Sequence, residues 1–290
     1  MKFDKNTKIL IVGLGLIGGS YAKALSDEGY FVGAIDKKKS SVEYALKNGL
    51  IQVGETSVKK DFVKDFDLIV FALYPHDFIN WIKEYQSSIK SGALITDVTG
   101  VKSFVVENVQ KILRGDLEFV GAHPMAGKEV SGVENADPKI FVGANYIVTP
   151  TKRNTDENVQ AVKELGRALG FERISSLSPE EHDETVGFLS HLTHCIAVSL
   201  MVSKKSHHLA EYTGDSFRDL TRIAKINDEM WSELFLANKD ELLKQMDLFE
   251  EKFNQLKEDI KNDNREKIRE TLRESTARRK VFDKDAKETK

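Results

Sequence analysis

The sequence predicts an α/β protein with a doubly wound parallel sheet in its N-terminal half and an all-α second domain after it. Two observations lead to this prediction. Through the first half, short and continuously apolar runs alternate with amphipathic segments, which is typical of parallel strands covered by helices on both faces. After Ser178 no convincing strand pattern follows, and apolar residues recur at helical spacing.

The first half alternates between the two kinds of element. We expect strands over residues 8–12, 31–35, 68–73, 94–98, 119–122 and 146–148. We expect helices between them over residues 18–28, 41–48, 78–88 and 103–113. The polar stretch 150–154 is the candidate boundary, so the first domain is predicted over residues 1–150. A further helix (156–169) and strand (171–174) would extend it to about residue 176.

The second half begins with a helix start signal. Ser178 precedes Pro179 and is followed three residues later by Glu181, which predicts a capping box and a long helix over residues 180–203. Farther along, apolar residues recur in alternating steps of four and three, a heptad stripe suited to packing on a helix of a second subunit or of its own domain. The stripe consists of Leu242, Met246, Phe249, Phe253, Leu256 and Ile260. We expect a helical domain over residues 178–282 and a frayed charged tail over residues 283–290.

The composition is that of an ordinary soluble protein of about two domains. Of the 290 residues, 43 are basic and 46 are acidic, and this balance argues against a nucleic-acid binder. No run approaches the ~18 apolar residues of a membrane span, and the N-terminus has no signal-peptide pattern. The single cysteine, Cys195, excludes an intrachain disulfide and favours a reducing compartment. We therefore expect a cytoplasmic protein that binds neither membranes nor nucleic acids.

A glycine-rich turn follows the first predicted strand. Gly13, Gly15 and Gly18 form a G-x-G-x-x-G between a strand and a helix, the context of a Rossmann-type dinucleotide-binding loop. The first glycine would allow the tight turn, the second would let a pyrophosphate approach the backbone, and the third would let the helix pack on the strand. Leu16 and Ile17 would offer free N–H groups at the helix N-terminus. A tight turn without a ligand is the alternative.

An acidic residue ends the second predicted strand. Asp36 lies 18 residues past Gly18, where a carboxylate can accept hydrogen bonds from an adenine ribose and repel a 2′-phosphate. This position favours NAD over NADP. Lys37 and the two lysines after it weaken the preference, because a cation nearby can accommodate a phosphate. Ala72 and Leu73, at the end of a later strand, are expected to line the same cofactor site.

Polar residues also follow the later strands. His123 comes directly after the run that ends at Ala122, so it should lie at the ligand-binding edge of the sheet. An imidazole there can accept a proton from a substrate hydroxyl while hydride leaves the same carbon. A loop histidine without a role is the alternative. The segment from Asp97 to Lys102 ends an earlier strand and could line the same crevice.

The helical half carries further candidates. His191 and His194 lie three residues apart and share a helix face; with no further ligands evident, we expect substrate contacts rather than a metal site. Arg218 and Arg222 lie four residues apart, and two guanidinium groups on one face can clamp carboxylates. The alternative for the arginines is a solvated face paired with nearby acidic side chains.

Taken together, these motifs resemble the prephenate dehydrogenase family over nearly the whole chain. The strings that carry the resemblance are Gly13–Ser20, His123–Gly127, Ser190–His194, and Phe217–Ala224 with Met230–Trp231 downstream. The resemblance implies NAD-dependent oxidative decarboxylation of prephenate to 4-hydroxyphenylpyruvate, CO2 and NADH in tyrosine biosynthesis. It also implies a homodimer built through the helical domain.

The resemblance also implies roles for individual residues. His123 would polarise and deprotonate the substrate hydroxyl, Arg222 would pair with a carboxylate, and His194 would face the substrate as a catalytic residue. Other substrate-side positions are His191, Arg218, Glu129, Asp219, Trp231, Thr99 and Gly100. The cofactor-side positions are Gly13, Gly15, Leu16, Ile17, Gly18, Asp36, Lys37, Ala72, Leu73 and Asp97.

One position departs from the family pattern. Relatives commonly carry a serine where this chain has Gly100, so a hydroxyl contact there would have to come from Thr99.

Two other functions stay open. An arogenate dehydrogenase on the same scaffold is the nearest alternative, since arogenate carries an ammonium where prephenate carries a keto group. A nucleotide-binding sensor without turnover is a second alternative, which the presence of His123 and Arg222 disfavours.

Overall fold

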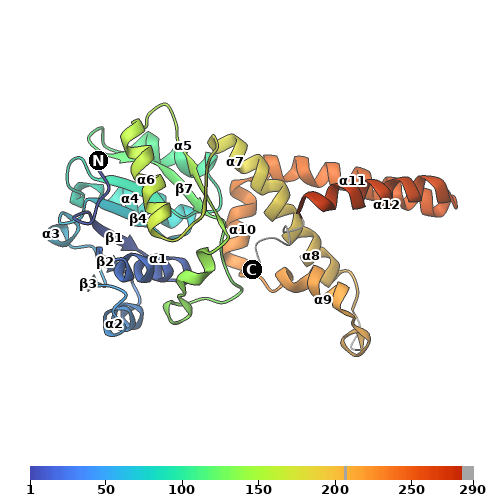
Figure 1. Ribbon diagram of the computed structural model, residues 1–290, viewed down its shortest axis with the longest axis horizontal. Helices are drawn as coiled ribbons and strands as arrows, with labels where there is room; N and C mark the ends of the chain where they lie inside the picture. The colour runs from blue at the N-terminus through green and yellow to red at the C-terminus, as the bar shows by residue number, and fades with distance from the viewer. Residues whose placement is uncertain (206–207, 283–290) are drawn as a thin grey trace. The chain divides into compact units, whose positions relative to one another are not determined.

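The computed structural model describes residues 1–205 and 208–282 (Figure 1). The predicted frayed tail, residues 283–290, lies outside the described residues. The chain forms two compact units, Met1–Lys239 and Asp240–Lys290. The first unit contains all strands of the described chain together with helices α1 to α10, and the second contains helices α11 and α12.

A six-stranded parallel sheet with helices on both faces forms the N-terminal half, as predicted. Its strand order is β3-β2-β1-β4-β5-β6, in which the direction of winding reverses between β1 and β4. The strands are β1 (Lys8–Val12), β2 (Phe31–Ile35), β3 (Val53–Glu55), β4 (Leu68–Phe71), β5 (Leu94–Asp97) and β6 (Glu118–Phe119). Strand β3 was not predicted, because a three-residue run is too short to show a pattern.

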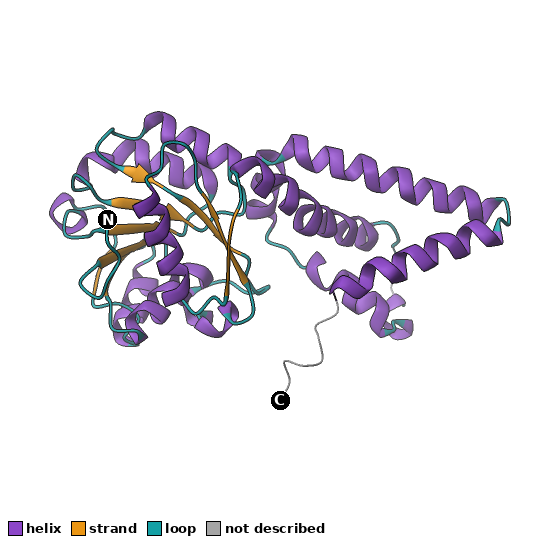
Figure 2. Ribbon diagram, turned by 45° about the horizontal axis from the view of Figure 1, so that its top comes forward, coloured by secondary structure: helices purple, strands orange, loops and turns teal. Residues whose placement is uncertain are grey.

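Both faces of the sheet are buried, which explains the continuously apolar strands. Along β1, Ile9 and Ile11 pack into one hydrophobic cluster, and Leu10 and Val12 pack into a second cluster on the other face. The covering helices are α1 (Leu16–Asp27), α2 (Lys39–Lys47), α3 (Lys60–Val63), α4 (Pro75–Tyr85), α5 (Ser103–Ile112) and α6 (Asp156–Ala168). Figure 2 shows helices on both sides of the strands.

A second, three-stranded sheet was not predicted. Strand β8 (Asn145–Thr149) pairs antiparallel with β7 (Gly121–Pro124) and parallel with β9 (Arg173–Ser176). The run predicted as one strand over residues 119–122 divides between β6 and β7. The Val120 N–H still donates to the Ile95 carbonyl, but the Ala122 N–H donates to the Asp97 carboxylate, so the chain leaves the large sheet here. As a result, His123 lies inside β7 opposite Ile147 rather than in the loop after a strand.

The predicted long helix begins at the capping box formed by Ser178 and Glu181, which is confirmed. It consists of α7 (Pro179–Val186), a π-helical segment (Gly187–Leu192) and α8 (Thr193–Val202). By its length and composition, this helix is apolar enough to cross a membrane. From the sequence we expected no such segment, because no unbroken run of apolar residues is long enough. Soluble core helices pass the same test, and this one buries the polar side chains of His182, Asp183 and His191.

The remaining helices complete the two units. Helices α9 (Asp215–Thr221) and α10 (Asp228–Ala237) belong to the first unit. In the second unit, α11 (Lys239–Lys261) and α12 (Arg265–Arg279) are joined by a turn in which Asp263 adopts a φ of 53°. The predicted heptad stripe lies on α11, and Met246, Phe249, Phe253 and Ile260 are 38% to 59% exposed.

Candidate active site

The glycine-rich loop has the geometry that a dinucleotide requires. Gly13 has a φ of +99°, and a Cβ on it would lie 2.4 Å from the Ala72 carbonyl oxygen and 2.9 Å from Leu73 Cδ2. A Cβ on Gly18 would lie 2.0 Å from the Gly13 carbonyl oxygen, so the start of α1 packs directly on the loop. A Cβ on Gly15 would meet nothing within 4 Å. The loop is therefore tight on its inner side and open at Gly15, at the N-terminus of α1.

Asp36 is fixed against the same loop. One carboxylate oxygen accepts from the Leu14 N–H at 2.6 Å, and the other accepts from the Lys38 N–H at 2.7 Å. The carboxylate at the end of β2 is thereby oriented toward the glycine-rich turn and retains lone pairs for further donors. Lys37 is exposed beside it.

A buried ionic cluster lies at the end of β5. The Lys102 ammonium is fully buried and donates to Asp97 at 2.6 Å and to the Thr99 hydroxyl at 3.1 Å. The Thr99 hydroxyl donates to the same Asp97 carboxylate. Burial lowers the pKa of Lys102, and the adjacent Asp97 charge opposes that shift. Asp97 thus holds Lys102 and, through the Ala122 N–H, the start of β7, whereas Thr99 holds Lys102. These structural contacts were not predicted.

The central feature of the site is a chain of hydrogen bonds that begins at His123. Its Nδ1 lies 2.9 Å from His182 Nε2, and His182 Nδ1 lies 2.8 Å from Asp183 Oδ1. Asp183 also accepts from the backbone N–H groups of Lys102 and Ser103, each at 2.8 Å, at the N-terminus of α5. Sequence reasoning missed His182 and Asp183. The only local signal is an adjacent His–Asp pair in the first turns of a helix.

Burial keeps the imidazoles of this cluster neutral. The pKa of His123 lies well below its usual value, first because of burial and then because of the neighbouring His182, Lys102 and His191. Burial also lowers the pKa of His182, although its hydrogen bond to Asp183 opposes the shift. For Asp183, burial acts against ionisation, but the His182 hydrogen bond and the two backbone donors outweigh it and lower its pKa.

His191 and His194 extend from this cluster along the long helix. His191 is buried, with its pKa lowered by burial to about 4, and its Nδ1 lies 3.3 Å from the Asn238 amide nitrogen. His194 stacks on Trp231 with ring centroids 3.7 Å apart, and the His191 ring approaches Trp231 edge-on at 6.0 Å. The two histidines therefore share a face, as predicted, and Trp231 lies against both.

The arginine cluster is more exposed. Arg222 forms an ion pair with Glu129, and the charges of both residues influence the pKa of His194, which burial lowers. Arg218 instead turns back to Asp215 at 3.0 Å and to the Thr213 carbonyl at 3.0 Å. Helix α9 ends at Thr221, so the two arginines do not continue one α-helical face. Arg218 therefore lies as expected for a solvated arginine paired with a nearby acidic side chain, and not as one of two arginines that bind a carboxylate together. Asp219 is also exposed.

Gly100 lies next to His123. A Cβ on Gly100 would be 3.8 Å from His123 Cε1 and 3.5 Å from Leu234 Cδ1, both ordinary contacts. A side chain at this position would therefore reach the candidate base. The buried Thr99 hydroxyl does not take its place, because its one proton is directed at Asp97 and the Val101 carbonyl and its oxygen accepts from Lys102.

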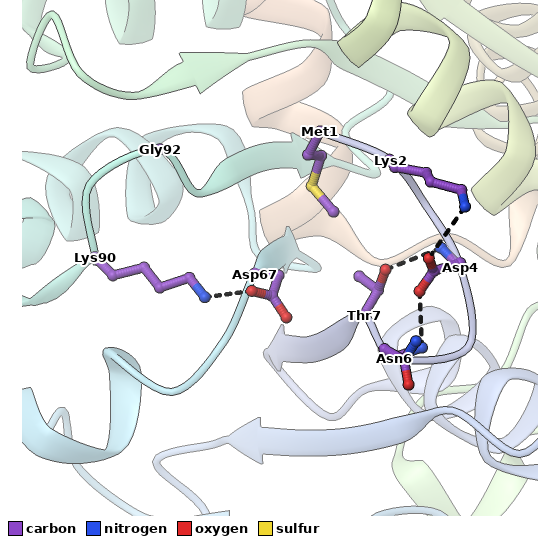
Figure 3. Close-up of a pocket in the computed structure, with 8 residues that line it drawn as sticks. All are labelled: Met1, Lys2, Asp4, Asn6, Thr7, Asp67, Lys90 and Gly92. Carbon is purple, nitrogen blue, oxygen red and sulfur yellow. Dashed lines mark hydrogen bonds and ion pairs between the residues drawn. The ribbon is translucent and has the colours of Figure 1, made fainter.

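A shallow pocket of about 300 Å³ lies elsewhere in the first unit, and Figure 3 shows its lining. It lies at the amino ends of β1 and β4, where Lys90 pairs with Asp67. Its lining consists of Met1, Lys2, Asp4, Asn6, Thr7, Asp67, Lys90 and Gly92. Because ligands of open parallel sheets bind beyond the carboxyl ends of the strands, this pocket is not the candidate active site.

Comparison with known proteins identifies the family. Residues 21–173 match the model of the prephenate dehydrogenase nucleotide-binding domain, and residues 178–274 match that of the prephenate dehydrogenase dimerization domain. The chain belongs to the prephenate dehydrogenase family. The resemblance predicted from the motifs is thus confirmed, as are the nucleotide-binding first half and the oxidoreductase class.

Relatives in this family differ in length and in their named substrates. Prephenate dehydrogenase of Bacillus subtilis is 34% identical over 249 residues, which are 82% of this chain and 66% of the relative. Prephenate dehydrogenase of Lactococcus lactis is 33% identical, and the match covers 86% of this chain and 70% of that protein. Cyclohexadienyl dehydrogenase of Zymomonas mobilis is 29% identical over 96% of both chains. The chain thus spans about two thirds of the length of the first two relatives.

Solved structures of the family superpose closely on this chain. A prephenate dehydrogenase structure from Aquifex aeolicus, in complex with hydroxyphenyl propionate and NAD+, is 34% identical with a TM-score of 0.87 and covers 96% of this chain and 98% of its own. Synechocystis arogenate dehydrogenase is 25% identical with a TM-score of 0.82 and covers 96% of this chain and 100% of its own. Both substrate names therefore occur among close structural relatives.

Proposed function

We propose that this protein oxidises and decarboxylates prephenate with NAD+, giving 4-hydroxyphenylpyruvate, CO2 and NADH. The main support for this proposal is the His123 imidazole, which is neutral and lies beyond the end of the parallel sheet. Its Nδ1 is bonded to His182, and no partner for Nε2 occurs in the described ranges 1–205 and 208–282. An unprotonated ring nitrogen of this kind can accept the proton of a substrate hydroxyl.

The cofactor side fits NAD. Gly15 leaves room for a pyrophosphate at the N-terminus of α1, and the Asp36 carboxylate beside the loop can accept from ribose hydroxyls and would repel a 2′-phosphate. When bound, the nicotinamide ring supplies the hydride acceptor for the carbon that carries the substrate hydroxyl. Residues Gly13–Gly18, Asp36, Ala72 and Leu73 would hold the dinucleotide, with Lys37 at its outer edge.

The substrate side supplies orientation and charge. Arg222 keeps guanidinium donors beyond those used by Glu129 and would pair with a prephenate carboxylate. His194 is held against Trp231 by stacking, and its Nδ1 lies 2.8 Å from the Ser190 carbonyl, so Nε2 is left to face the substrate. His123 would take the hydroxyl proton as the carbon–hydrogen bond breaks. Loss of CO2 then makes the substrate ring aromatic, which drives the reaction.

Arogenate is the second candidate substrate, and Glu129 favours it. This carboxylate, 39% exposed, lies on the substrate side next to Arg222 and could accept a hydrogen bond from the arogenate ammonium. Prephenate offers no cation at that place. The names of the relatives include both activities, so the two substrates must be compared directly.

The test is a set of initial rates measured as NADH or NADPH absorbance, with prephenate and arogenate each supplied with NAD+ and with NADP+. We expect the highest kcat/KM with prephenate and NAD+, with one CO2 and one 4-hydroxyphenylpyruvate formed per NADH. Preference for arogenate would transfer the proposal to that substrate. Preference for NADP+ would mean that Lys37 and its neighbours outweigh Asp36. No turnover with any pair would favour a nucleotide-binding sensor.

We further propose that the protein is a homodimer formed through its helical half and works in the cytoplasm. Large apolar side chains of the α11 stripe are exposed in the single chain, and the matching family model is that of a dimerization domain. The lone Cys195 suits a reducing compartment. Light scattering should give twice the chain mass of 32.7 kDa, and Phe253→Glu should lower it toward one chain. A monomeric mass for the wild type would contradict the dimer.

A further inference from the structure

We propose that His182 and Asp183 are positioning residues that hold His123 in the tautomer with a proton on Nδ1, so that Nε2 faces the substrate as an acceptor. This inference rests on the proposed role of His123 and adds two residues to it. It follows from the hydrogen-bond chain that joins β7, helix α7 and the N-terminus of α5.

The donor and acceptor of each hydrogen bond follow from the Asp183 carboxylate, which lies at the end of the chain opposite His123. The Asp183 carboxylate can only accept, so His182 Nδ1 must carry the proton that is shared with Asp183 Oδ1 at 2.8 Å. A neutral His182 then has a lone pair on Nε2. The contact of 2.9 Å between His182 Nε2 and His123 Nδ1 requires one donor, which is therefore the Nδ1–H of His123. Nε2 of His123 is left unprotonated.

The carboxylate at the end of this chain is itself fixed. Two backbone N–H groups at the N-terminus of α5 donate to its two oxygens, one to each, at 2.8 Å. The positive end of the α5 dipole stabilises the ionised form. Asp183 is 2% exposed and His182 is fully buried, so water does not compete for these bonds. The arrangement resembles a catalytic triad in its logic, with a second imidazole between the acid and the base.

Charged groups around this chain of hydrogen bonds act in both directions on its protonation. The buried Lys102 ammonium disfavours a cationic His123 or His182, whereas the Asp183 and Asp97 carboxylates favour a cationic His182. Burial is the largest influence and lowers the pKa of both imidazoles. The Asn238 amide donates to the Asp183 backbone carbonyl at 2.9 Å. The neutral tautomer pattern is therefore the one that burial supports.

The kinetic test compares two substitutions of the same residue. In His182→Leu no acceptor faces His123 Nδ1, and we expect kcat to fall about 10- to 100-fold with the KM for prephenate nearly unchanged. In His182→Gln the amide nitrogen can donate to Asp183 and the amide oxygen can accept from His123, so we expect most of the lost kcat to return. Equal loss in both variants, or a wild-type kcat in His182→Leu, would overturn the proposal.

A spectroscopic test needs no turnover. Two-bond ¹⁵N–¹H correlation spectra of histidine-labelled wild-type protein report which ring nitrogen is protonated, and His123→Asn identifies the His123 signals. We expect Nδ1 to be protonated in the wild type and in His182→Gln, and a shift toward the Nε2–H tautomer in His182→Leu. An Nε2–H tautomer of His123 in the wild type would overturn the inference. Absence of prephenate turnover with the expected tautomer would instead contradict the proposed function alone.

Discussion

The two halves of the candidate site are built in opposite ways. Around His123 the groups are buried and linked in sequence, and the acid at the end of the chain is capped by a helix N-terminus. Around Arg222 the side chains lie near the surface, and the arginine is 64% exposed in its ion pair with Glu129. A residue that accepts a proton must hold a single protonation state and a fixed position relative to the substrate. A residue that binds a carboxylate needs a positive charge that the substrate can contact, which an exposed arginine supplies.

This contrast predicts which kinetic constant each half controls. The buried half should affect kcat, because its groups act on the atom that reacts. The exposed half should affect KM, because its contacts are made equally in the bound substrate and in the transition state.

The largest effect is expected for His123→Asn. Removing the base should lower kcat with prephenate by roughly 10²- to 10⁴-fold, the usual scale for a general base. Binding of prephenate, measured by calorimetry in the presence of NADH, should be largely retained. A kcat within a factor of two of the wild type would remove His123 from the mechanism.

A smaller effect, on the other constant, is expected for Arg222→Ala. Loss of a charged hydrogen-bond partner should raise the KM for prephenate about 10- to 100-fold. Arg218→Ala is the matched control, because Arg218 is already committed to Asp215 and to the Thr213 carbonyl. We expect its KM to change less than about threefold. Equal effects in the two variants would mean that neither guanidinium is specifically placed.

Acid should destabilise the buried half. His191 has its pKa lowered by burial to about 4, whereas in the unfolded chain it titrates near 6.5. Above pH 6.5 the residue is neutral in both states. As the pH falls from 6.5 toward 4, the unfolded chain binds a proton that the folded protein does not, so the free energy of unfolding falls. The contribution lost between pH 7 and pH 5 is about 2 kcal/mol.

Urea unfolding of the wild type and of His191→Asn at pH 7 and pH 5 would measure this contribution. The asparagine oxygen can still accept from Asn238, but it cannot titrate. We expect the variant to lose about 2 kcal/mol less than the wild type over that range. Identical losses in the two proteins would contradict a buried neutral His191.

The smallest effect is expected at Gly100. A serine there fits, since its Cβ would make ordinary contacts with Leu234 and His123. We expect Gly100→Ser to change kcat/KM less than about fivefold, because the His182–Asp183 chain already orients His123. Gly100→Ala is the control that adds the Cβ without the hydroxyl. A larger gain in Gly100→Ser alone would mean that the hydroxyl contributes an interaction that this protein lacks.

The sequence was informative where local pattern and function coincide. The glycine-rich loop, Asp36 and the capping box of Ser178 each depend on residues close together in the chain, and their geometry follows from that spacing. The position of His123 near the sheet edge was also predictable, although its place inside β7 was not. That depends on Asp97, whose side chain replaces a strand partner at Ala122.

The parts that escaped prediction depend on distant contacts. His182 meets His123 across 59 positions, and Asp183 caps a helix that begins 80 residues earlier. No spacing rule connects such positions. The shared face expected for Arg218 and Arg222 required one continuous helix, and the spacing of the two residues did not show that α9 ends at Thr221, between them.

We infer that the buried and exposed halves of the site act independently. The double variant His123→Asn/Arg222→Ala tests this independence. Initial rates over a range of prephenate concentrations, at saturating NAD+, give its kcat and KM. We predict the kcat of His123→Asn alone together with the KM of Arg222→Ala alone, because the two changes remove separate interactions. A double variant no worse in kcat/KM than the poorer single variant would show that the two residues act as one unit, which contradicts the claim.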